Sequence, residues 1–508
     1  MGHTQTVNFF NEATGRLQPM TNVAGGLARV GFRGAVWQGL ALVGGKAIVL
    51  ITTIVLARLL SPEQYGLVAA ALVLMAYVET VADAGVAQAL VYLPASGVAA
   101  RSALLVSVLL GTSLSLLTFF SAPWIAGLFQ LPDVGPLVQV LSIAVLATSL
   151  GAVPEALLRR DLLFRRLAVA PIIRALVTGV LSLVLAFAGY GAFSLAAGTA
   201  AGAVAYAATC WWLVRKGAPW QIWRVAKDAL RANLKFGVPV AGSNLLARLI
   251  FDIDYVIIGV ILGAQALGYY TLAFRLPEAL IINVFFVLST VLFPLYTQVQ
   301  HQPERLRDGY LKGVRVQSLY GMTAGVGLAV LAPILVPLVF GGQWSESVIP
   351  LVFLALYAAA RSLGAGANDV YKAIGRPGIS ITFSLIRLAV LVPVLLVAAQ
   401  WGIIAVACAQ MATALLFAVG MQTVAARVLH IGPKAMLRAV LPAFACSLAV
   451  AGAGSIIFLQ LYLGAPLTAA LVFVTAIAAV YGVLRFGFPT LHNELLHLVR
   501  RRQDAAAE

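Results

Sequence analysis

Eleven ionisable side chains lie inside long apolar stretches of this sequence, where charge is rare. An ionised group at the centre of a bilayer costs roughly 2.5–3.5 kcal/mol or more, so it normally faces a cavity or a partner. These residues are therefore the candidates for binding chemistry. Six are basic and five are acidic: Lys46, Arg174, Arg248, Arg275, Arg361 and Arg387, and Glu79, Asp83, Asp252, Asp254 and Glu278.

The surplus of cations predicts a polar, net cationic cavity that binds an anionic substrate. Arginine presents a planar fork of N–H donors that matches phosphate and pyrophosphate oxygens. We therefore interpret all six basic residues as substrate-binding candidates, and the five acidic residues as candidates for cation or proton coupling.

Purely structural ion pairs are the alternative. Arg248 and Asp252 are spaced i,i+4, and Arg275 and Glu278 are spaced i,i+3, so each pair could neutralise itself on one helix. Glu79 and Asp83 share a helix face and could pair with Lys46 on the neighbouring helix.

The composition indicates a membrane protein rather than a soluble one. Of 508 residues, 61% are hydrophobic and 10% are charged, against about 25% charged in globular proteins. The net charge of +16 does not indicate nucleic acid binding, because the basic residues are concentrated in the loops. No phosphate-binding GxxxxGK[ST] or zinc-binding HExxH motif occurs, and the three cysteines are scattered, so we expect no cofactor or metal.

The chain contains fourteen apolar stretches long enough to cross a bilayer as helices. We expect an all-α polytopic fold with spans at 35–57, 66–90, 102–124, 136–157, 168–189, 192–214, 236–262, 267–298, 316–340, 347–368, 378–399, 402–426, 438–461 and 465–486.

The loops between these spans alternate between basic and nearly uncharged. Arg58 is the exception, since it follows the first span on the uncharged side. Basic loops remain in the cytoplasm, so the pattern predicts an even number of spans. Both termini are then expected on the cytoplasmic side of the cell inner membrane. The basic side also offers contacts for anionic membrane lipids.

The hairpin at residues 34–90 has a weak counterpart about 202 residues later. At this offset Gly66 aligns with Gly268, Leu60 with Leu262, Arg33 with Lys235, and Lys46 with Arg248. Internal repeats are common in transporters, with the site at the repeat interface.

The repeat predicts two six-helix lobes related by a pseudo-twofold axis, followed by two further helices. The expected divisions are a cytoplasmic tail 1–33, an N-lobe 34–214, an amphipathic linker 215–235, a C-lobe 236–430, spans 13 and 14 in 431–486, and a basic tail 487–508.

Three stretches resemble the bacterial polysaccharide transporters of the multidrug/oligosaccharidyl-lipid/polysaccharide exporter superfamily. They begin at Leu56 (LARLLSPEQYGLVAAALVLMAYVETVADAGVAQAL), Pro154 (PEALLRRDLLFRRLA) and Phe251 (FDIDYVIIGVILGAQALGYYTLAFRL). In the third stretch the residues that match the family pattern are Asp254, Gly259, Gly263, Gly268, Tyr270, Ala273 and Arg275.

This resemblance implies two bundles around a central cavity that opens alternately to each side of the inner membrane. It also implies a lipid-linked oligosaccharide as substrate, usually on undecaprenyl pyrophosphate, in exopolysaccharide, capsule or lipopolysaccharide synthesis. Partners would be this substrate, membrane lipids, and a polysaccharide polymerase with its export machinery.

Three alternatives remain at this stage. A multidrug or cation antiporter of the same superfamily would favour an acidic cavity. A carrier of the major facilitator class would have a basic loop between spans 2 and 3, where this chain has only Arg101. A membrane polymerase, ligase or glycosyltransferase would need a sizeable outer loop with catalytic groups, and the outer loops here are short and nearly chargeless.

Overall fold

The structure is a computed structural model that describes residues 44–83, 85–92, 97–214, 227–460, 464–489 and 491. Within these ranges the regular elements are helical and no strand occurs, which confirms the prediction of an all-α membrane fold. The predicted tail 1–33, the start of the first span and residues 215–226 of the predicted linker lie outside the described residues.

The first half of the chain begins with a helix whose described part covers residues 44–59. The helices that follow are α2 (Pro62–Asp83), α3 (Val86–Tyr92), α4 (Gly97–Leu128), α5 (Val134–Arg160), α6 (Phe164–Leu167), α7 (Val169–Phe187) and α8 (Ala192–Val214).

The described part of the second half contains nine α-helices and four short helical turns. They are α9 (Lys227–Ile261), α10 (Gly263–Pro277), η1 (Glu278–Ile282), α11 (Asn283–Gln298), α12 (Pro303–Phe340), η2 (Gly342–Ser347), α13 (Val348–Ala373), α14 (Pro377–Ala398), η3 (Ala399–Trp401), α15 (Ile403–Val428), α16 (Pro433–Gln460), α17 (Ala465–Gly482) and η4 (Val483–Gly487).

Twelve helical segments of the described chain are long and apolar enough to cross a membrane, each overlapping a predicted span. The two other predicted spans correspond to the helix at 44–59 and to α9, which holds three charged residues in its apolar half. Helix α9 begins at Lys227, inside the predicted amphipathic linker, and the predicted second span comprises both α2 and α3, with Gly85 at a φ of +65° before α3.

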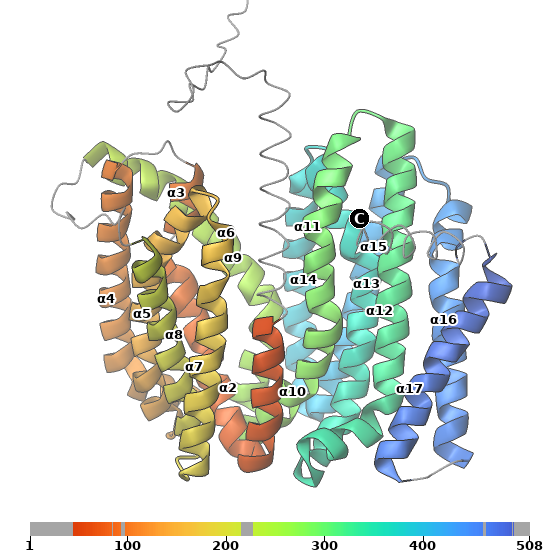
Figure 1. Cartoon of the computed structure of the whole chain (residues 1–508), viewed down its shortest axis with the longest axis horizontal. Helices are drawn as coiled ribbons and strands as arrows, with labels where there is room; N and C mark the ends of the chain where they lie inside the picture. The colour runs from red at the N-terminus through yellow and green to blue at the C-terminus, as the bar shows by residue number, and fades with distance from the viewer. Residues whose placement is uncertain are drawn as a thin grey trace, which may run out of the picture.

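Figure 1 shows two neighbouring groups of helices, with α4, α5, α7 and α8 in one and α12 to α15 in the other. Helices α16 and α17 lie on the outer side of the second group, against α12. Helix α9 packs against α3 and α4 of the first group and against α10 and α14 of the second. It therefore bridges the two groups rather than belonging wholly to the second.

The two ends of the bundle differ in charge. One end, which we call the basic end, carries Arg159 and Arg160 of α5 and Arg305 and Arg307 of α12. The opposite end has turns that lack lysine and arginine, apart from Arg58, and the exposed aromatic side chains of Trp124, Tyr190 and Trp401. Tryptophan and tyrosine at this level are typical of a membrane–water interface.

The three largest clusters of buried apolar residues in the described chain are one shared core toward the opposite end and two separate cores at the basic end. The shared core joins Leu56 and Leu141 of the first group to Tyr270 and Trp344 of the second. At the basic end, the first group has a core around Leu104, Leu157 and Val86, and the second has its own around Tyr310, Tyr371 and Leu429. The groups are thus packed together at one end and separate at the other.

Helices α2 and α10 cross in close contact at the opposite end. A Cβ on Gly66 would lie 1.7 Å from the carbonyl oxygen of Ala264, and one on Gly268 would lie 1.9 Å from that of Pro62. The 202-residue offset relates Gly66 to Gly268 and Pro62 to Ala264. Each contact is therefore the counterpart of the other, as a twofold axis requires. This local symmetry agrees with the predicted pseudo-twofold repeat, and only glycine fits at either position.

Arg58, the exception to the charge pattern, links the two groups at this same end. Its guanidinium donates to the carbonyl oxygens of Leu338 and Val339, at the C-terminus of α12. A cation there satisfies free carbonyls and complements the helix dipole. A second hydrogen bond joins the same two groups: the indole N–H of Trp344 donates to the carbonyl oxygen of Ala57 at 2.7 Å.

Candidate functional site

A cavity of about 1210 Å³ lies between the two groups of helices. On α2 and α3 its lining runs from Ala69, next to the crossing at Gly66, to Ala87 near the basic end. The rest of the wall comes from the helix at 44–59, α5, α7, α8, α9, α10, η1 and α11. It exceeds the roughly 300–1,000 Å³ of pockets for drug-sized ligands.

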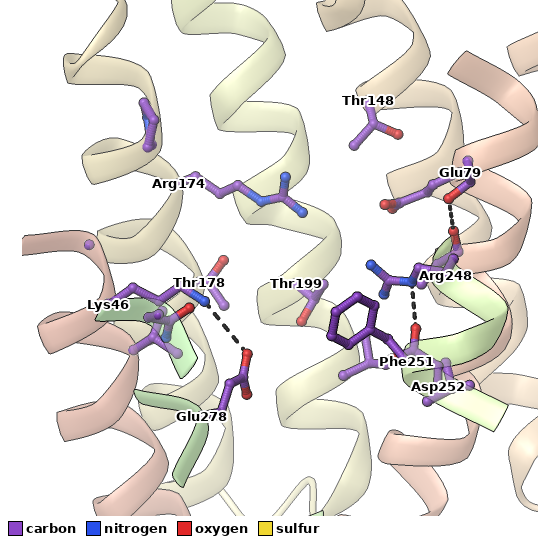
Figure 2. Close-up of a pocket in the computed structure, with 18 of the residues that line it drawn as sticks. Lys46, Glu79, Thr148, Arg174, Thr178, Thr199, Arg248, Phe251, Asp252 and Glu278 are labelled. Atoms are coloured by element: carbon purple, nitrogen blue, oxygen red, sulfur yellow. Dashed lines mark hydrogen bonds and ion pairs between the residues drawn. The ribbon is translucent and has the colours of Figure 1, made fainter. Parts of the chain in front are cut away.

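One wall carries a chain of three charges. Lys46 Nζ lies 3.7 Å from Glu278 Oε1, and Arg275 Nη1 lies 3.5 Å from Glu278 Oε2 (Figure 2 shows the first pair). The Arg275 pairing was predicted, but the predicted pairing of Lys46 with Glu79 or Asp83 was wrong. It failed because α10, far away in sequence, brings Glu278 to Lys46.

Glu278 begins the π-helical turn η1, directly after Pro277. Proline lacks the N–H that continues an α-helical ladder, and π-helical turns often occur at functional sites. The turn divides the predicted span 267–298 into α10 and α11 and holds Glu278 between two cations.

The facing wall carries Arg248 and Asp252 of α9. Arg248 Nε lies 2.5 Å from Asp252 Oδ2, as the i,i+4 spacing predicted (Figure 2). The Arg248 side chain is 45% exposed and that of Lys46 is 44% exposed, so both cations of the sequence repeat face the cavity.

Arg174 of α7 projects toward the middle of the cavity in Figure 2. No carboxylate among the described residues lies within 4.0 Å of its guanidinium, whose carbon is 5.9 Å from the centre of the Tyr206 ring. Neither Glu79 nor Asp83 has a cation of the described chain within 4.0 Å. Arg174 is therefore the cavity cation whose donors are least engaged by acidic partners.

The prediction of a net cationic cavity is not supported by the described lining. Four basic side chains face five acidic ones: Lys46, Arg174, Arg248 and Arg275, and Glu79, Asp83, Glu155, Asp252 and Glu278. Glu155 escaped the sequence analysis because it lies close to the arginines of the basic end, and Arg159 Nη2 is 2.5 Å from it.

Three predicted site residues do not line this cavity. Arg361 of α13 lies behind Phe251, its guanidinium carbon 4.6 Å from the centre of that ring. Arg387 of α14 is partly buried on a helix that packs against α13. Asp254 is 4% exposed and accepts hydrogen bonds from the Tyr270 hydroxyl at 2.7 Å and the Gln410 amide at 2.9 Å.

Neutral polar residues complete the lining, and the charge-based analysis missed them. They include hydroxyls and amides that can bind a sugar: Thr80, Thr148, Ser149, Thr178, Thr199, Tyr206, Asn244, Thr271 and Asn283. A smaller recess of about 150 Å³ shares Thr178, Thr199 and Arg275 and continues toward the opposite end past Thr52 and Ser182. Isolated threonines in apolar helices give no signal in a sequence, because only the fold brings them together.

Known proteins show the same sequence pattern. The profile of the family described as "Polysaccharide biosynthesis protein" matches residues 55–349. The lipopolysaccharide biosynthesis protein WzxC of Escherichia coli (strain K12) is 25% identical over 372 residues, which cover 72% of this chain and 75% of that protein. The succinoglycan biosynthesis transport protein ExoT of Rhizobium meliloti (strain 1021) is 26% identical over 355 residues, covering 69% and 71% respectively.

Two solved structures share the fold. The lipid II flippase MurJ in its inward closed conformation superposes with a TM-score of 0.71 at 15% identity, covering 89% of this chain and 99% of MurJ. An inward-facing multidrug resistance MATE family transporter of the MOP superfamily gives a TM-score of 0.61 at 16% identity, covering 76% and 96%.

Proposed function

Because the chain belongs to the polysaccharide biosynthesis protein family, we propose that it flips a lipid-linked oligosaccharide across the membrane. The sugar head passes through the cavity while the lipid tail stays in the bilayer. The relatives named for lipopolysaccharide and succinoglycan synthesis support a polysaccharide repeat unit as the cargo.

The mixed lining of the cavity is the observation that carries this proposal. Sugar hydroxyls both donate and accept hydrogen bonds, so they need carboxylates, amides and hydroxyls as well as cations. Arg174, Lys46 and Arg248 supply donors for a diphosphate, and Glu79 and Asp83 supply acceptors for sugar hydroxyls. A purely cationic cavity would suit a phosphate but not the oligosaccharide attached to it.

We assign the closed end of the cavity to the outer face of the membrane. We infer from the positive-inside rule that the basic end faces the cytoplasm, where lipid-linked sugars are assembled. The membrane that we propose is the bacterial inner membrane. The cavity extends from that end to the crossing of α2 and α10, so it is placed to load from the cytoplasm. A polymerase on the outer face would receive the flipped unit.

A cation antiporter is the second candidate, and one observation favours it. The described lining holds one more acidic than basic side chain, and the MATE fold is shared. Glu79 and Asp83 would then bind a cationic drug instead of sugar hydroxyls.

A reconstituted flipping assay separates the two candidates. Purified protein in liposomes is given an undecaprenyl-diphosphate oligosaccharide, and the exposure of its sugar to an external lectin is followed. We expect flipping above the rate of protein-free liposomes and no uptake of a cationic dye driven by a proton gradient. Dye uptake without flipping of any of several bacterial repeat units would replace the flippase with the antiporter.

A further inference from the structure

Two arginines outside the cavity lie near the middle of their membrane helices. Arg361 is the fourteenth of the 26 residues of α13, and Arg387 is the eleventh of the 22 residues of α14. Charges at this depth need a compensating partner. Yet no carboxylate among the described residues lies within 4.0 Å of either guanidinium.

The partners that these arginines do have are neutral. Arg361 Nη1 donates to the Tyr357 hydroxyl at 3.0 Å, and its guanidinium lies over the rings of Phe251 and Tyr357 at 4.6 and 5.7 Å. Arg387 lies on α14, which packs against α13. Its buried Nε has no hydrogen-bond partner among the described residues. Two cations on adjacent helices thus lack acidic partners, and Arg387 leaves a buried donor unused.

The Phe251 side chain lies between Arg361 and the main cavity. Its ring is exposed to the cavity, as Figure 2 shows, while it also covers Arg361. A cation–π contact is weak compared with a charged hydrogen bond, so an anion can replace the ring over the guanidinium. Rotation of one side chain would connect the two spaces.

We propose that Arg361, Arg387 and Tyr357 form an anion subsite for a phosphate-class oxyanion, reached from the main cavity when Phe251 moves aside. The identity of the natural ligand rests on the proposed function: it is the diphosphate of the lipid-linked substrate. The headgroup of an anionic phospholipid has the same chemistry and is the other source. An anion bound in the subsite neutralises the two arginines. The subsite also lets the second group of helices contact the substrate directly.

Chemical protection of the arginines in the wild-type protein tests this subsite. The purified full-length chain in zwitterionic lipid nanodiscs is treated with methylglyoxal, a reagent smaller than a diphosphate, and modified arginines are counted by peptide mass spectrometry. One arm adds inorganic pyrophosphate, and a second uses nanodiscs that contain phosphatidylglycerol. Arg376, exposed at the start of α14, is the internal control.

We expect pyrophosphate to reduce modification of Arg361 and Arg387 at least fivefold and to leave Arg376 unchanged. Protection by phosphatidylglycerol alone would assign the same subsite to a lipid headgroup. Equal modification in all arms, or no modification of either arginine, would overturn the proposal, since a site that admits a diphosphate must admit the reagent.

A variant of the covering side chain gives a second measurement. Phe251→Ala is expected to raise modification of Arg361 severalfold, whereas Phe119→Ala, which removes an exposed ring from α4, leaves it unchanged. Identical rates in both variants would exclude Phe251 as the cover. None of these arms requires transport, so protection without flipping would retain the subsite and count only against the flippase function.

Discussion

At the scale of single residues, the basic side chains of the cavity differ in their acidic partners: three are paired with carboxylates and one is not. Lys46 and Arg275 share Glu278, and Arg248 is paired with Asp252. Removing one member of such a pair leaves the other charge without its partner, which costs stability as well as function. Arg174 has no such partner among the described residues, so its removal isolates the effect on the substrate.

Arg174→Gln is therefore expected to reduce flipping with little loss of stability. A hydrogen bond to a charged group contributes about 1.5–3 kcal/mol, which corresponds to a decrease of roughly 10- to 150-fold. Flipping rates in liposomes and the thermal unfolding temperature of the purified protein measure the two effects. Arg376→Gln removes an exposed charge outside the cavity and is the control. A wild-type flipping rate in Arg174→Gln would show that this arginine does not hold the substrate.

At the scale of helices, the contact between α2 and α10 determines which end of the cavity is closed. The helices touch through backbone atoms, because Gly66 and Gly268 have no side chains to hold them apart. The hydrogen bonds of Arg58 and Trp344 reinforce the same end. An outward-open state must break all of these contacts.

Gly66→Ala is expected to force α2 and α10 apart. The new methyl group would lie 1.7 Å from the Ala264 carbonyl oxygen, and overpacking of this kind costs about 1–3 kcal/mol. Spin labels at Glu63→Cys and Gln265→Cys should report a longer distance in this variant. Gly127→Ala on α4, where a Cβ meets nothing within 4 Å, makes the same chemical change without a contact. The prediction fails if both variants keep the wild-type distance and unfolding temperature.

At the scale of the whole molecule, the uneven distribution of charge sets the orientation in the membrane. Basic loops meet at one end, and exposed aromatic side chains gather at the other. Translocation of a positively charged loop is disfavoured, so we expect the basic end to lie in the cytoplasm. With this orientation the cavity would face the side on which the proposed substrate is made.

Labelling of single cysteines in intact cells tests this orientation. In a variant without Cys210, Cys408 and Cys446, an impermeant maleimide should modify Ser345→Cys in η2 but not His301→Cys before α12. Both positions are exposed, so accessibility differs only by the side of the membrane. Modification of His301→Cys alone would invert the orientation, and the cavity would then load from outside.

The sequence alone determined the helical membrane fold, the approximate spans, the expected orientation and the family. These follow from long apolar runs, charged loops and local motifs, each of which acts over neighbouring residues. It also identified the i,i+4 and i,i+3 ion pairs of α9 and of α10 with η1, because one helical turn fixes their spacing.

Only the tertiary structure decided which charges meet across helices. It paired Lys46 with Glu278, placed Arg361 against Phe251 and Arg387 outside the cavity, and added Glu155 and the hydroxyl groups to the lining. Depth along a helix can be counted from its sequence, but the direction in which a side chain faces depends on helix rotation and packing. A helix that is apolar on every face has no sequence pattern that reveals this rotation. The charge of the cavity could therefore not be predicted.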